Sequence, residues 1–298
     1  MKKILIIGKN GFVGKSLTEY FNAQPDYEVT ATSSRELDLM DGEAVREALS
    51  KVHYDLVIDA ACFVPKPGIS REEQRALDHD LRMYQNLARC SQLFGRMIIF
   101  GSGAEYDKRG EIVSVTEKDL YTHPLPDNDY GFSKYLIARD VETTENIYDL
   151  RIFGLYGRYE DYRVKFITGC IGKAIFDIPL SIRKNVYFDF LYIDDFCRML
   201  HRFAELDKPA HHVYNIVKNE KVDLLTLAKL VLKVTGKTLP VTVAQEGLAN
   251  EYTACGERLQ DEIGYHDFVT HEDAIREIYE YYLSVKDKLD EAAIRGNI

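Results

Sequence analysis

Apolar residues along the first half of the chain alternate between short continuous runs and helical spacings. The run Lys2–Ile7 is almost wholly apolar and rich in β-branched residues, which is typical of a parallel strand buried on both faces. Phe12–Phe21 instead places its apolar residues at helical spacing. The alternation continues with expected strands at Glu28–Thr32, Asp55–Ala61, Arg96–Phe100 and Tyr148–Phe153, and helices at Asp41–Lys51, Arg71–Phe94 and Gly131–Thr144. This order predicts an α/β fold with a doubly wound parallel sheet of the Rossmann type.

The pattern becomes less regular after Gly157. A basic and aromatic stretch from Arg158 to Phe166 leads into a helix, an apolar stretch spans Ile182–Tyr192, and Asp194-Asp195 are expected to cap another helix. The remaining expected elements are a strand at Val213–Val217 and helices at Asp223–Val234 and His271–Leu283. We expect residues 1–160 to form a dinucleotide-binding domain, with 186–217 threaded back into it, and residues 161–185 and 218–298 to form a smaller, interleaved substrate lobe.

Composition narrows the classes of partner. The 298 residues carry 38 Lys and Arg against 48 Asp and Glu, a formal charge of −10. This balance argues against binding to nucleic acid and against attraction to an anionic membrane, because both need a basic face. It leaves room for a local basic pocket that binds a phosphorylated ligand.

Apolar runs and the spacing of cysteines and histidines bear on the cellular compartment and on metal binding. The apolar run near the N-terminus is too short for a signal peptide, and no stretch approaches the roughly 18 apolar residues of a membrane span. The five cysteines and eight histidines show no zinc-ligand spacing, so we expect reduced thiols, a cytoplasmic protein and no metal.

Three glycines stand directly between the first expected strand and the first expected helix. Gly8, Gly11 and Gly14 form a G-x-x-G-x-x-G pattern. Missing side chains allow a tight turn and the close approach of a pyrophosphate, while the helix N-terminus supplies N–H donors. The sequence therefore predicts a dinucleotide site here.

The residues after the second expected strand bear on which dinucleotide binds. An NAD site commonly places an acid there to hold the ribose 2′-hydroxyl, but Thr32-Ser33-Ser34-Arg35 contains none. Hydroxyl groups and an arginine suit a 2′-phosphate better. Ser33 and Arg35 thus favour NADP, with NAD as the alternative.

A Tyr-x-x-x-Lys pattern occurs three times, and context separates the copies. Tyr214 lies in an expected strand and Tyr282 in an amphipathic helix, so both are expected to be structural. Tyr130 opens a helix, which places Lys134 one turn away on the same face, where its ammonium can favour the phenolate. Ser102 follows an expected strand at its carboxyl end, where it could polarise a carbonyl beside Tyr130.

Six ordered motifs resemble the extended short-chain dehydrogenase/reductase family, which comprises NAD(P)-dependent nucleotide-sugar epimerases, dehydratases and ketoreductases. They are Gly8–Gly14, Val57–Ala61, Gly101–Tyr106, Tyr130–Lys134, Arg151–Gly157 and Tyr192–Asp195. The resemblance implies that Tyr130 is the proton donor or acceptor, that Lys134 holds the nicotinamide ribose, and that Ser102 binds the reacting sugar oxygen. It implies further cofactor contacts at Asn10, Phe12, Val13, Asp38, Leu39, Ala60 and Ala61. It also implies a homodimer through the helices expected at 71–94 and 131–144.

Departures from the family pattern narrow the reaction. A 4,6-dehydratase carries Thr-Asp-Glu where Ser102-Gly103-Ala104 stand, and a 3,5-epimerising relative carries a cysteine at Ala104. Hydride transfer by a 4-ketoreductase or an NAD-dependent 4-epimerase remains, and Arg35 favours the reductase. A non-catalytic dinucleotide-binding regulatory protein is a further alternative.

The substrate site departs from the pattern as well. The family commonly has Asn at Gly154, Arg at Phe188 for the nucleotide diphosphate, and Asn at Asp80. The expected substrate is nucleotide-sugar-like, with contacts at Ser102, Gly154, Arg158, Arg163, Lys165 and Arg183.

Overall fold

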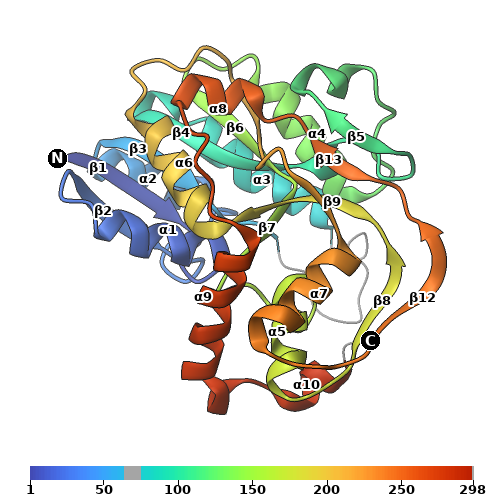
Figure 1. Ribbon diagram of the computed structural model, residues 1–298. Coiled ribbons are helices and arrows are strands. Elements are labelled where there is room, and N and C mark those ends of the chain that lie inside the picture. The colour runs from blue at the N-terminus through green and yellow to red at the C-terminus, as the bar shows by residue number, and fades with distance from the viewer. Residues whose placement is uncertain (64–74, 297–298) are drawn as a thin grey trace.

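The computed structural model describes residues 1–63 and 75–296. Its central sheet has six parallel strands in the order β10-β6-β4-β3-β1-β2. Their bounds are β1 Lys2–Ile7, β2 Tyr27–Thr32, β3 Tyr54–Asp59, β4 Phe94–Ser102, β6 Ile147–Ile152 and β10 Val213–Ile216. The predicted doubly wound parallel sheet is confirmed (Figure 1).

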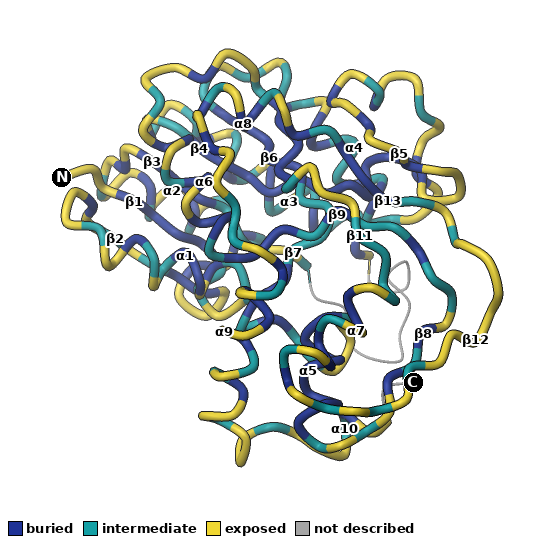
Figure 2. The backbone as a smooth tube through the Cα atoms, in the orientation of Figure 1, coloured by how far each residue is buried: buried dark blue, intermediate teal, exposed yellow. Residues whose placement is uncertain are grey.

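Helices cover both faces of this sheet because its strands are apolar on both sides. Along β1, Ile4 and Ile6 face one core, whereas Leu5 and Ile7 face the other. The first core includes side chains of α1 (Phe12–Asn22) and α6 (Ile193–Glu205), and the second those of α2 (Gly42–Lys51), α3 (Ala76–Ala88) and α4 (Asp129–Val141). Figure 2 shows the strands as a largely buried layer between these helices.

The strand order reverses beside β1. The chain runs from β1 outward to β2 and then returns to β3 on the other side of β1. Parallel sheets of this kind bind ligands at such a reversal, at the carboxyl ends of the strands. Gly8, Ala60 and Ala61 follow β1 and β3 at this edge.

A second sheet assembles from short, widely separated strands. Its order is β11-β9-β13-β5, with β7 added against β9, and β8 pairs separately with β12. The bounds are β5 Ile112–Val115, β7 Gly154–Tyr156, β8 Leu180–Asn185, β9 Tyr187–Tyr192, β11 Lys221–Asp223, β12 Val241–Leu248 and β13 Tyr252–Ala254. The stretch Ile182–Tyr192 thus contributes to two strands in two different sheets. We call the β11-β9-β13-β5 assembly, with β7, the five-stranded sheet.

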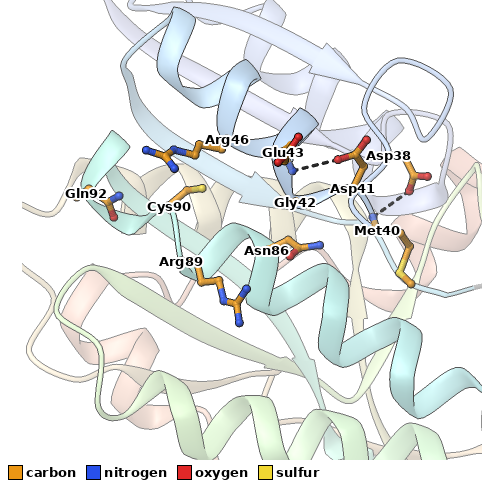
Figure 3. A pocket seen from close by; sticks show the side chains of 10 residues that line it. All are labelled: Asp38, Met40, Asp41, Gly42, Glu43, Arg46, Asn86, Arg89, Cys90 and Gln92. Carbon is orange, nitrogen blue, oxygen red and sulfur yellow. Dashed lines mark hydrogen bonds between the residues drawn. The ribbon is translucent and has the colours of Figure 1, made fainter.

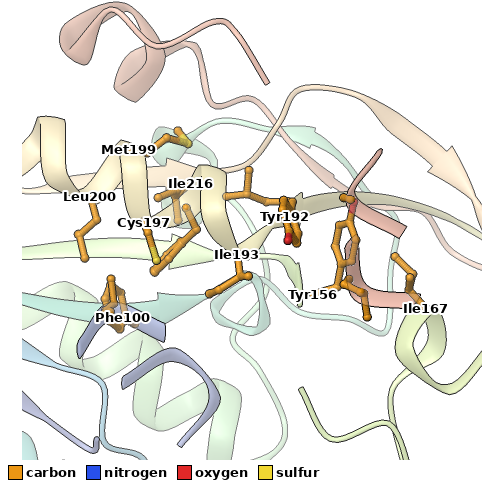
Figure 4. Close-up of a cluster of buried hydrophobic side chains, with 14 of the residues drawn as sticks. Phe100, Tyr156, Ile167, Tyr192, Ile193, Cys197, Met199, Leu200 and Ile216 are labelled. Carbon is orange, nitrogen blue, oxygen red and sulfur yellow. The ribbon is translucent and has the colours of Figure 1, made fainter. Parts of the chain in front are cut away.

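The remaining helices close the second half of the molecule. They are α5 (Phe166–Ile175), α7 (Leu224–Thr235), α8 (Glu257–Ile263), α9 (His271–Ser284) and α10 (Glu291–Gly296), with 3-10 turns η1 (Ser91–Leu93), η2 (Gly103–Glu105), η3 (Glu117–Tyr121) and η4 (Lys286–Lys288). Helices α5, α7 and α9 pack together, and their apolar side chains join the core below α6. Figure 4 shows part of this core, in which Phe100 of β4 lies among α6 side chains such as Cys197 and Leu200.

The prediction of one long helix over residues 71–94 is wrong at the C-terminal end. Helix α3 ends at Ala88, and β4 already begins at Phe94; residues 71–74 of the expected helix lie outside the described part of the chain. The Asn146 amide donates to the carbonyl oxygens of Ser91, Phe94 and Gly95, at 3.0, 3.3 and 3.1 Å. This distant side chain stabilises the turn into the sheet and so overrides the local helical pattern.

Asp194 and Asp195 do not cap α6. Both lie in its first turn, and Tyr192 occupies the N-cap position. Asp195 is fully buried and accepts hydrogen bonds from the Tyr265 hydroxyl at 2.6 Å and from the Val269 amide at 3.0 Å. It therefore ties α6 to the C-terminal part of the chain.

The segment 186–217 divides between the two sheets. Helix α6 and strand β10 belong with the six-stranded sheet, whereas β9 pairs with β7, β11 and β13. Two of the tyrosines interpreted as structural, Tyr214 in β10 and Tyr282 in α9, have exposed fractions of 0% and 1%. They are therefore core residues.

Candidate active site

The glycine loop is shaped by contacts that exclude side chains. Gly8 has a φ of +90°, and a Cβ there would lie 2.9 Å from the Ala60 carbonyl group. A Cβ at Gly14 would overlap the carbonyl oxygen of Gly8. The backbone of β1, the loop and α1 therefore packs at distances that only glycine permits, which leaves the N-terminus of α1 accessible to a phosphate group.

A pocket of about 230 Å³ opens beside this loop at the strand ends. We call it the strand-end pocket. It brings together eight of the residues predicted to bind a cofactor: Gly8, Asn10, Gly11, Ser33, Asp38, Leu39, Ala60 and Ala61. Its other lining residues are Ile7, Ser34, Leu37, Cys62 and Met83, which sequence reasoning did not identify. A glycine cradle next to an elongated set of strand-end residues fits a dinucleotide.

Arg35 and Ser33, the residues predicted to bind near the ribose of the cofactor, have different neighbours. Arg35 is exposed and forms no ion pair with any described residue. Glu36, however, accepts hydrogen bonds from the amide and hydroxyl of Ser33, at 2.9 and 2.8 Å, and pairs with Lys9 at 2.7 Å. The Lys9 ammonium and Ser33 lower the pKa of Glu36 to about 2. A carboxylate therefore stands at this end of the pocket, and a lysine offsets its charge.

Ser102 is the last residue of β4 and not, as expected, a residue just beyond it. Its side chain accepts a hydrogen bond from the Ala104 amide, and its own amide donates to Glu105 at 2.9 Å. These reciprocal bonds form a capping box around the short η2 turn. The hydroxyl of Ser102 is thereby fixed at the carboxyl edge of the sheet.

A buried cluster of Arg151, Glu105 and Asp149 stabilises the turn that follows Ser102. Arg151 of β6 has a fully buried side chain and pairs with Glu105 at 2.5 Å and with Asp149 at 3.5 Å. Burial raises the pKa of both carboxyl groups, whereas Arg151 opposes that shift. The guanidinium also donates to the Tyr106 hydroxyl and the Glu117 carbonyl, so it connects β6 to η2 and η3.

Tyr130 and Lys134 lie on the first turns of α4. The Asn128 side chain caps this helix by accepting from the Gly131 amide at 2.9 Å. Lys134 donates to the Phe100 carbonyl at 2.8 Å, two residues before Ser102. Burial alone would lower the pKa of Lys134, but the nearby Tyr130 and Asp80 raise it above its ordinary value. The lysine therefore stays charged beside the tyrosine, as the helical spacing predicted.

Asp80 occupies the position where the family pattern has asparagine. Its two oxygens accept from the Phe63 amide at 3.1 Å and from the Ser133 hydroxyl at 3.1 Å. The carboxylate thus accepts the kind of hydrogen bonds that an asparagine carbonyl would accept, and adds a charge near Lys134.

Tyr252 is a residue of this site that sequence reasoning missed. It lies in β13, is 6% exposed, and its hydroxyl lies against Gly103, the residue that follows Ser102. A Cβ at Gly103 would overlap that hydroxyl, so the glycine makes room for it. Tyr130 also lies within electrostatic range of Tyr252. No local signal marks Tyr252, because it reaches Ser102 only through the pairing of β13 with β5 and β9.

The predicted substrate residues do not gather in one place. Lys165 and Arg183 meet in a second pocket of about 230 Å³, which we call the basic pocket. Its lining residues are Val164, Lys165, Phe166, Gly169, Cys170, Lys173, Ser181, Ile182, Arg183, Lys184 and Leu224. Arg158 instead lines a separate pocket with Asn10 and Gly11 of the glycine loop, and pairs with Asp194 at 3.3 Å.

Gly154 and Arg163 are placed differently again. A Cβ at Gly154 would lie 2.7 Å from the Asp189 carbonyl oxygen, so close backbone packing of β7 against β9 accounts for this glycine. Arg163 is exposed and pairs with Asp161 at 2.7 Å. Phe188, where the family pattern has arginine, packs on the ring of Tyr252 at 5.5 Å.

A larger pocket, of about 810 Å³, lies away from these residues in the groove between α2 and α3 (Figure 3). It is lined by Asp38, Met40, Asp41, Gly42, Glu43, Arg46, Asn86, Arg89, Cys90 and Gln92. The acidic side chains gather at the N-terminus of α2 and the arginines lie toward the opposite end. It shares Asp38 with the strand-end pocket but contains neither the glycine loop nor Ser102, Tyr130 or Lys134.

Other kinds of site find no support in the described residues. No helix in residues 1–63 and 75–296 is long and apolar enough to cross a bilayer. Across the same ranges, no three His, Cys, Asp or Glu side chains gather as a metal site requires.

Comparison with known proteins agrees with this geometry. The family model described as "NAD dependent epimerase/dehydratase family" matches residues 4–217. The GDP-L-colitose synthase of Yersinia pseudotuberculosis is 22% identical over 96% of this chain and 99% of its own length.

Two solved structures share the fold. The NADP-bound GDP-L-fucose synthetase of Naegleria fowleri is 16% identical with a TM-score of 0.83, covering 96% of this chain and 94% of its own. The UDP-glucuronic acid 4-epimerase of Bacillus cereus, in complex with UDP-glucuronic acid and NAD, is 20% identical with a TM-score of 0.78, covering 95% and 99%.

Proposed function

The chain belongs to the NAD dependent epimerase/dehydratase family, and on that premise we propose that it transfers hydride at a keto or hydroxyl carbon of a nucleotide-sugar-like substrate. The favoured reaction is that of a 4-ketoreductase. The observation that carries this proposal is the packing of the start of α4, which holds Tyr130 and Lys134, against η2, which directly follows Ser102. Lys134 is bonded to the Phe100 carbonyl, which joins the start of α4 to the end of β4.

Each of the three side chains has a defined task in this reaction. A bound nicotinamide supplies or accepts the hydride. Tyr130 donates a proton to the sugar oxygen in the reductive direction and accepts it in the oxidative direction. Ser102 donates a hydrogen bond to the same oxygen and so stabilises its developing charge. The charged Lys134 favours loss of the tyrosine proton and is placed to hold the nicotinamide ribose.

Elimination of water requires an acid and a base at the two positions after Ser102, and the one acid of this turn, Glu105, is buried in an ion pair with Arg151. Gly103 and Ala104 follow Ser102 where a dehydratase has an acidic pair, and Ala104 offers no thiol for proton abstraction next to a keto group. Both facts leave simple hydride transfer as the reaction of this site. An NAD-dependent nucleotide-sugar 4-epimerase is the second candidate, favoured by the acid Glu36 beside Ser33.

We propose NADP as the cofactor, with NAD as the alternative. The exposed Arg35, which forms no ion pair within residues 1–63 and 75–296, supports NADP because it is available for a 2′-phosphate. The carboxylate of Glu36 disfavours NADP because it repels a 2′-phosphate, although Lys9 offsets its charge. The remaining proposed cofactor contacts are the strand-end pocket residues together with Phe12, Val13 and Gly14 of α1.

The basic pocket is the proposed binding place of the nucleotide part of the substrate. Lys165 and Arg183 line it together with Lys173 and Lys184, so it concentrates positive charge on a chain whose formal charge is −10. Arg158, which lies beside the glycine loop, is better placed for a cofactor phosphate, and Arg163 is engaged by Asp161.

Assembly and location are part of the same proposal. Helices α3 and α4 pack side by side, and Tyr84 donates to Asp140 between them at 2.7 Å. We propose that their outer faces form a homodimer interface and that the protein is cytoplasmic. The division into residues 1–160 with 186–217, and 161–185 with 218–298, is proposed as the division between cofactor and substrate binding.

Replacing Tyr130 by phenylalanine tests the reaction. On a panel of nucleotide 4-keto sugars with NADPH, Tyr130→Phe is expected to lower turnover by about 10²–10⁴-fold, because it removes the proton donor. NADPH binding, followed by fluorescence, should be unchanged.

Tyr282→Phe is the matched control, since Tyr282 belongs to another Tyr-x-x-x-Lys pattern but lies in the core. It should retain turnover. Full activity of Tyr130→Phe would remove the assigned role. Dinucleotide binding without turnover of any substrate would instead favour the regulatory alternative.

A further inference from the structure

A pocket of about 380 Å³ adjoins the glycine loop. Its walls come from the loop and the start of α1, from residues 158–162, and from the end of α9 with η4. We call it the tyrosine pocket because four tyrosines line it: Tyr159, Tyr162, Tyr281 and Tyr282. Asn10 and Gly11 line both this pocket and the strand-end pocket, so the two are neighbours. Its volume lies within the range of small-molecule sites, roughly 300–1,000 Å³.

The tyrosine pocket carries more positive than negative charge. Its three cations are Lys15, Arg158 and Lys288. Neither lysine forms an ion pair with a described residue, and Arg158 has an acidic partner at 3.3 Å. Glu160, the acid of the lining, accepts a hydrogen bond from the Thr168 hydroxyl at 2.8 Å, and burial raises its pKa to about 8. Glu160 is thus largely protonated at neutral pH, so the pocket attracts an anion to a chain whose formal charge is −10.

The tyrosines add flat apolar surfaces beside these cations. The rings of Tyr159 and Tyr281 meet at right angles, with 5.7 Å between their centres. The Lys15 ammonium lies 3.7 Å from the centre of the Tyr159 ring, and the Tyr159 hydroxyl donates to Glu19 at 2.8 Å. Nucleobases stack on aromatic side chains of this kind, and nearby cations bind the attached phosphate. The lining therefore suits a ligand that joins a flat ring to an anionic group.

Two buried polar atoms on the lining residues have no hydrogen-bond partner within the described chain. They are the Nε of Arg158 and the hydroxyl of Tyr282. Tyr282 is 1% exposed, and the Thr168 hydroxyl close to it donates to Glu160 instead. A buried donor without a partner costs free energy, and such groups are usually satisfied by a bound molecule. An occupant with oxygen acceptors would remove this cost.

We propose that the tyrosine pocket is a binding site for a nucleoside monophosphate, separate from the proposed cofactor and substrate sites. Lys15 and Lys288 bind its phosphate, and the ring of Tyr281 packs against its base. The occupant lies next to the glycine loop, because Asn10 and Gly11 belong to both pockets. The site goes beyond the proposed reaction and can be measured without turnover.

Calorimetric titration with AMP tests this site in the full chain saturated with NADPH, which fills the strand-end pocket and excludes the probe from it. Lys288→Met is expected to weaken AMP binding by about fivefold, as the loss of one exposed charge partner does. Lys286→Met is the matched control. Lys286 lies on the same turn, η4, but outside the lining, and its ammonium is 5.5 Å from the centre of the Phe176 ring. It should leave AMP affinity unchanged.

A second probe, ribose 5-phosphate, separates the phosphate from the base. Tyr281→Leu should weaken AMP by about fivefold and leave ribose 5-phosphate unchanged, because only AMP has a base to stack. Lys288→Met should weaken both probes. Tyr279→Leu is the control, since Tyr279 is a half-buried tyrosine of the same helix that lies outside the lining.

Thermal melting and NADPH affinity of each variant exclude a general loss of structure. The proposal is contradicted if AMP does not bind the NADPH-saturated protein at millimolar concentration. It is also contradicted if either Lys288→Met or Tyr281→Leu binds AMP within twofold of the native protein, because AMP then binds elsewhere. Absence of turnover in the Tyr130 experiment, by contrast, would overturn the proposed reaction and leave the AMP result standing.

Discussion

The two sheets contribute to the proposed reaction site by different physical means. The six-stranded sheet presents backbone: Gly8 and Gly14 allow β1, the loop and α1 to pack so closely that no Cβ fits. The five-stranded sheet presents side chains, because β13 brings the Tyr252 hydroxyl against Gly103, the residue after Ser102, from far along the sequence. Backbone shape therefore determines the proposed cofactor half of the site, and the pairing of distant strands determines the proposed substrate half.

The largest loss of stability is expected from a change at Arg151, where the two halves of the site are joined. Arg151→Met removes the guanidinium between Glu105 and Asp149 and leaves buried carboxyl groups without their counter-charge. We expect a loss of roughly 3–5 kcal/mol in the free energy of unfolding, measured by urea titration. The exposed Arg46 provides the control Arg46→Met, which should change stability by less than about 0.5 kcal/mol. Equal effects of the two changes would show that the buried cluster does not stabilise the junction.

Adding a single methyl group at Gly14 should impair the proposed cofactor half of the site alone. In Gly14→Ala the new Cβ would meet the Gly8 carbonyl oxygen, so the loop must shift away from the phosphate position. We expect NADPH affinity to fall by about 100-fold or more, since several backbone donors move together. Gly110→Ala, whose Cβ would have nothing within 4 Å, should leave the affinity unchanged. Tight NADPH binding by Gly14→Ala would mean that the loop geometry does not govern the cofactor half.

The smallest effect concerns the choice of cofactor at the edge of the strand-end pocket. Arg35→Ala should weaken NADPH by about fivefold, near 1 kcal/mol, and leave NADH unaffected, because only the 2′-phosphate contacts this exposed cation. Glu36→Gln should strengthen NADPH by a similar factor, because Lys9 loses its partner and becomes available to the phosphate. Paired dissociation constants for both dinucleotides measure these shifts. A change in NADH binding equal to that in NADPH binding would argue against a 2′-phosphate site here.

The same contrast explains what sequence reasoning could find. The strand Lys2–Ile7 matches the structure residue for residue, and Asp41 caps α2 as predicted, because these features depend on neighbouring residues. The eight predicted cofactor residues that meet in the strand-end pocket also lie next to three strand ends. Local pattern was sufficient for Gly8, Gly11 and Ser33, whereas the other five residues were assigned through the resemblance to the family.

The other half depends on contacts between distant residues. Strands β7 and β13 have only three residues each, too few to show a period, and they are stabilised by partners far along the chain. Asn146 ends the helix expected at 71–94 through hydrogen bonds to a segment about 50 residues earlier. Tyr252 could not be assigned for the same reason, since it comes close to Ser102 only after the five-stranded sheet has formed.

Transfer of labelled hydride tests the central claim most directly. The enzyme is incubated with a panel of nucleotide 4-keto sugars and with NADPH that is deuterated at the reactive position of the nicotinamide. The masses of the products are then measured by mass spectrometry. The account predicts one deuterium on the sugar for each NADPH oxidised, and at least about 100-fold less label with Tyr130→Phe. Turnover that leaves the sugar unlabelled, or full labelling by Tyr130→Phe, would contradict it.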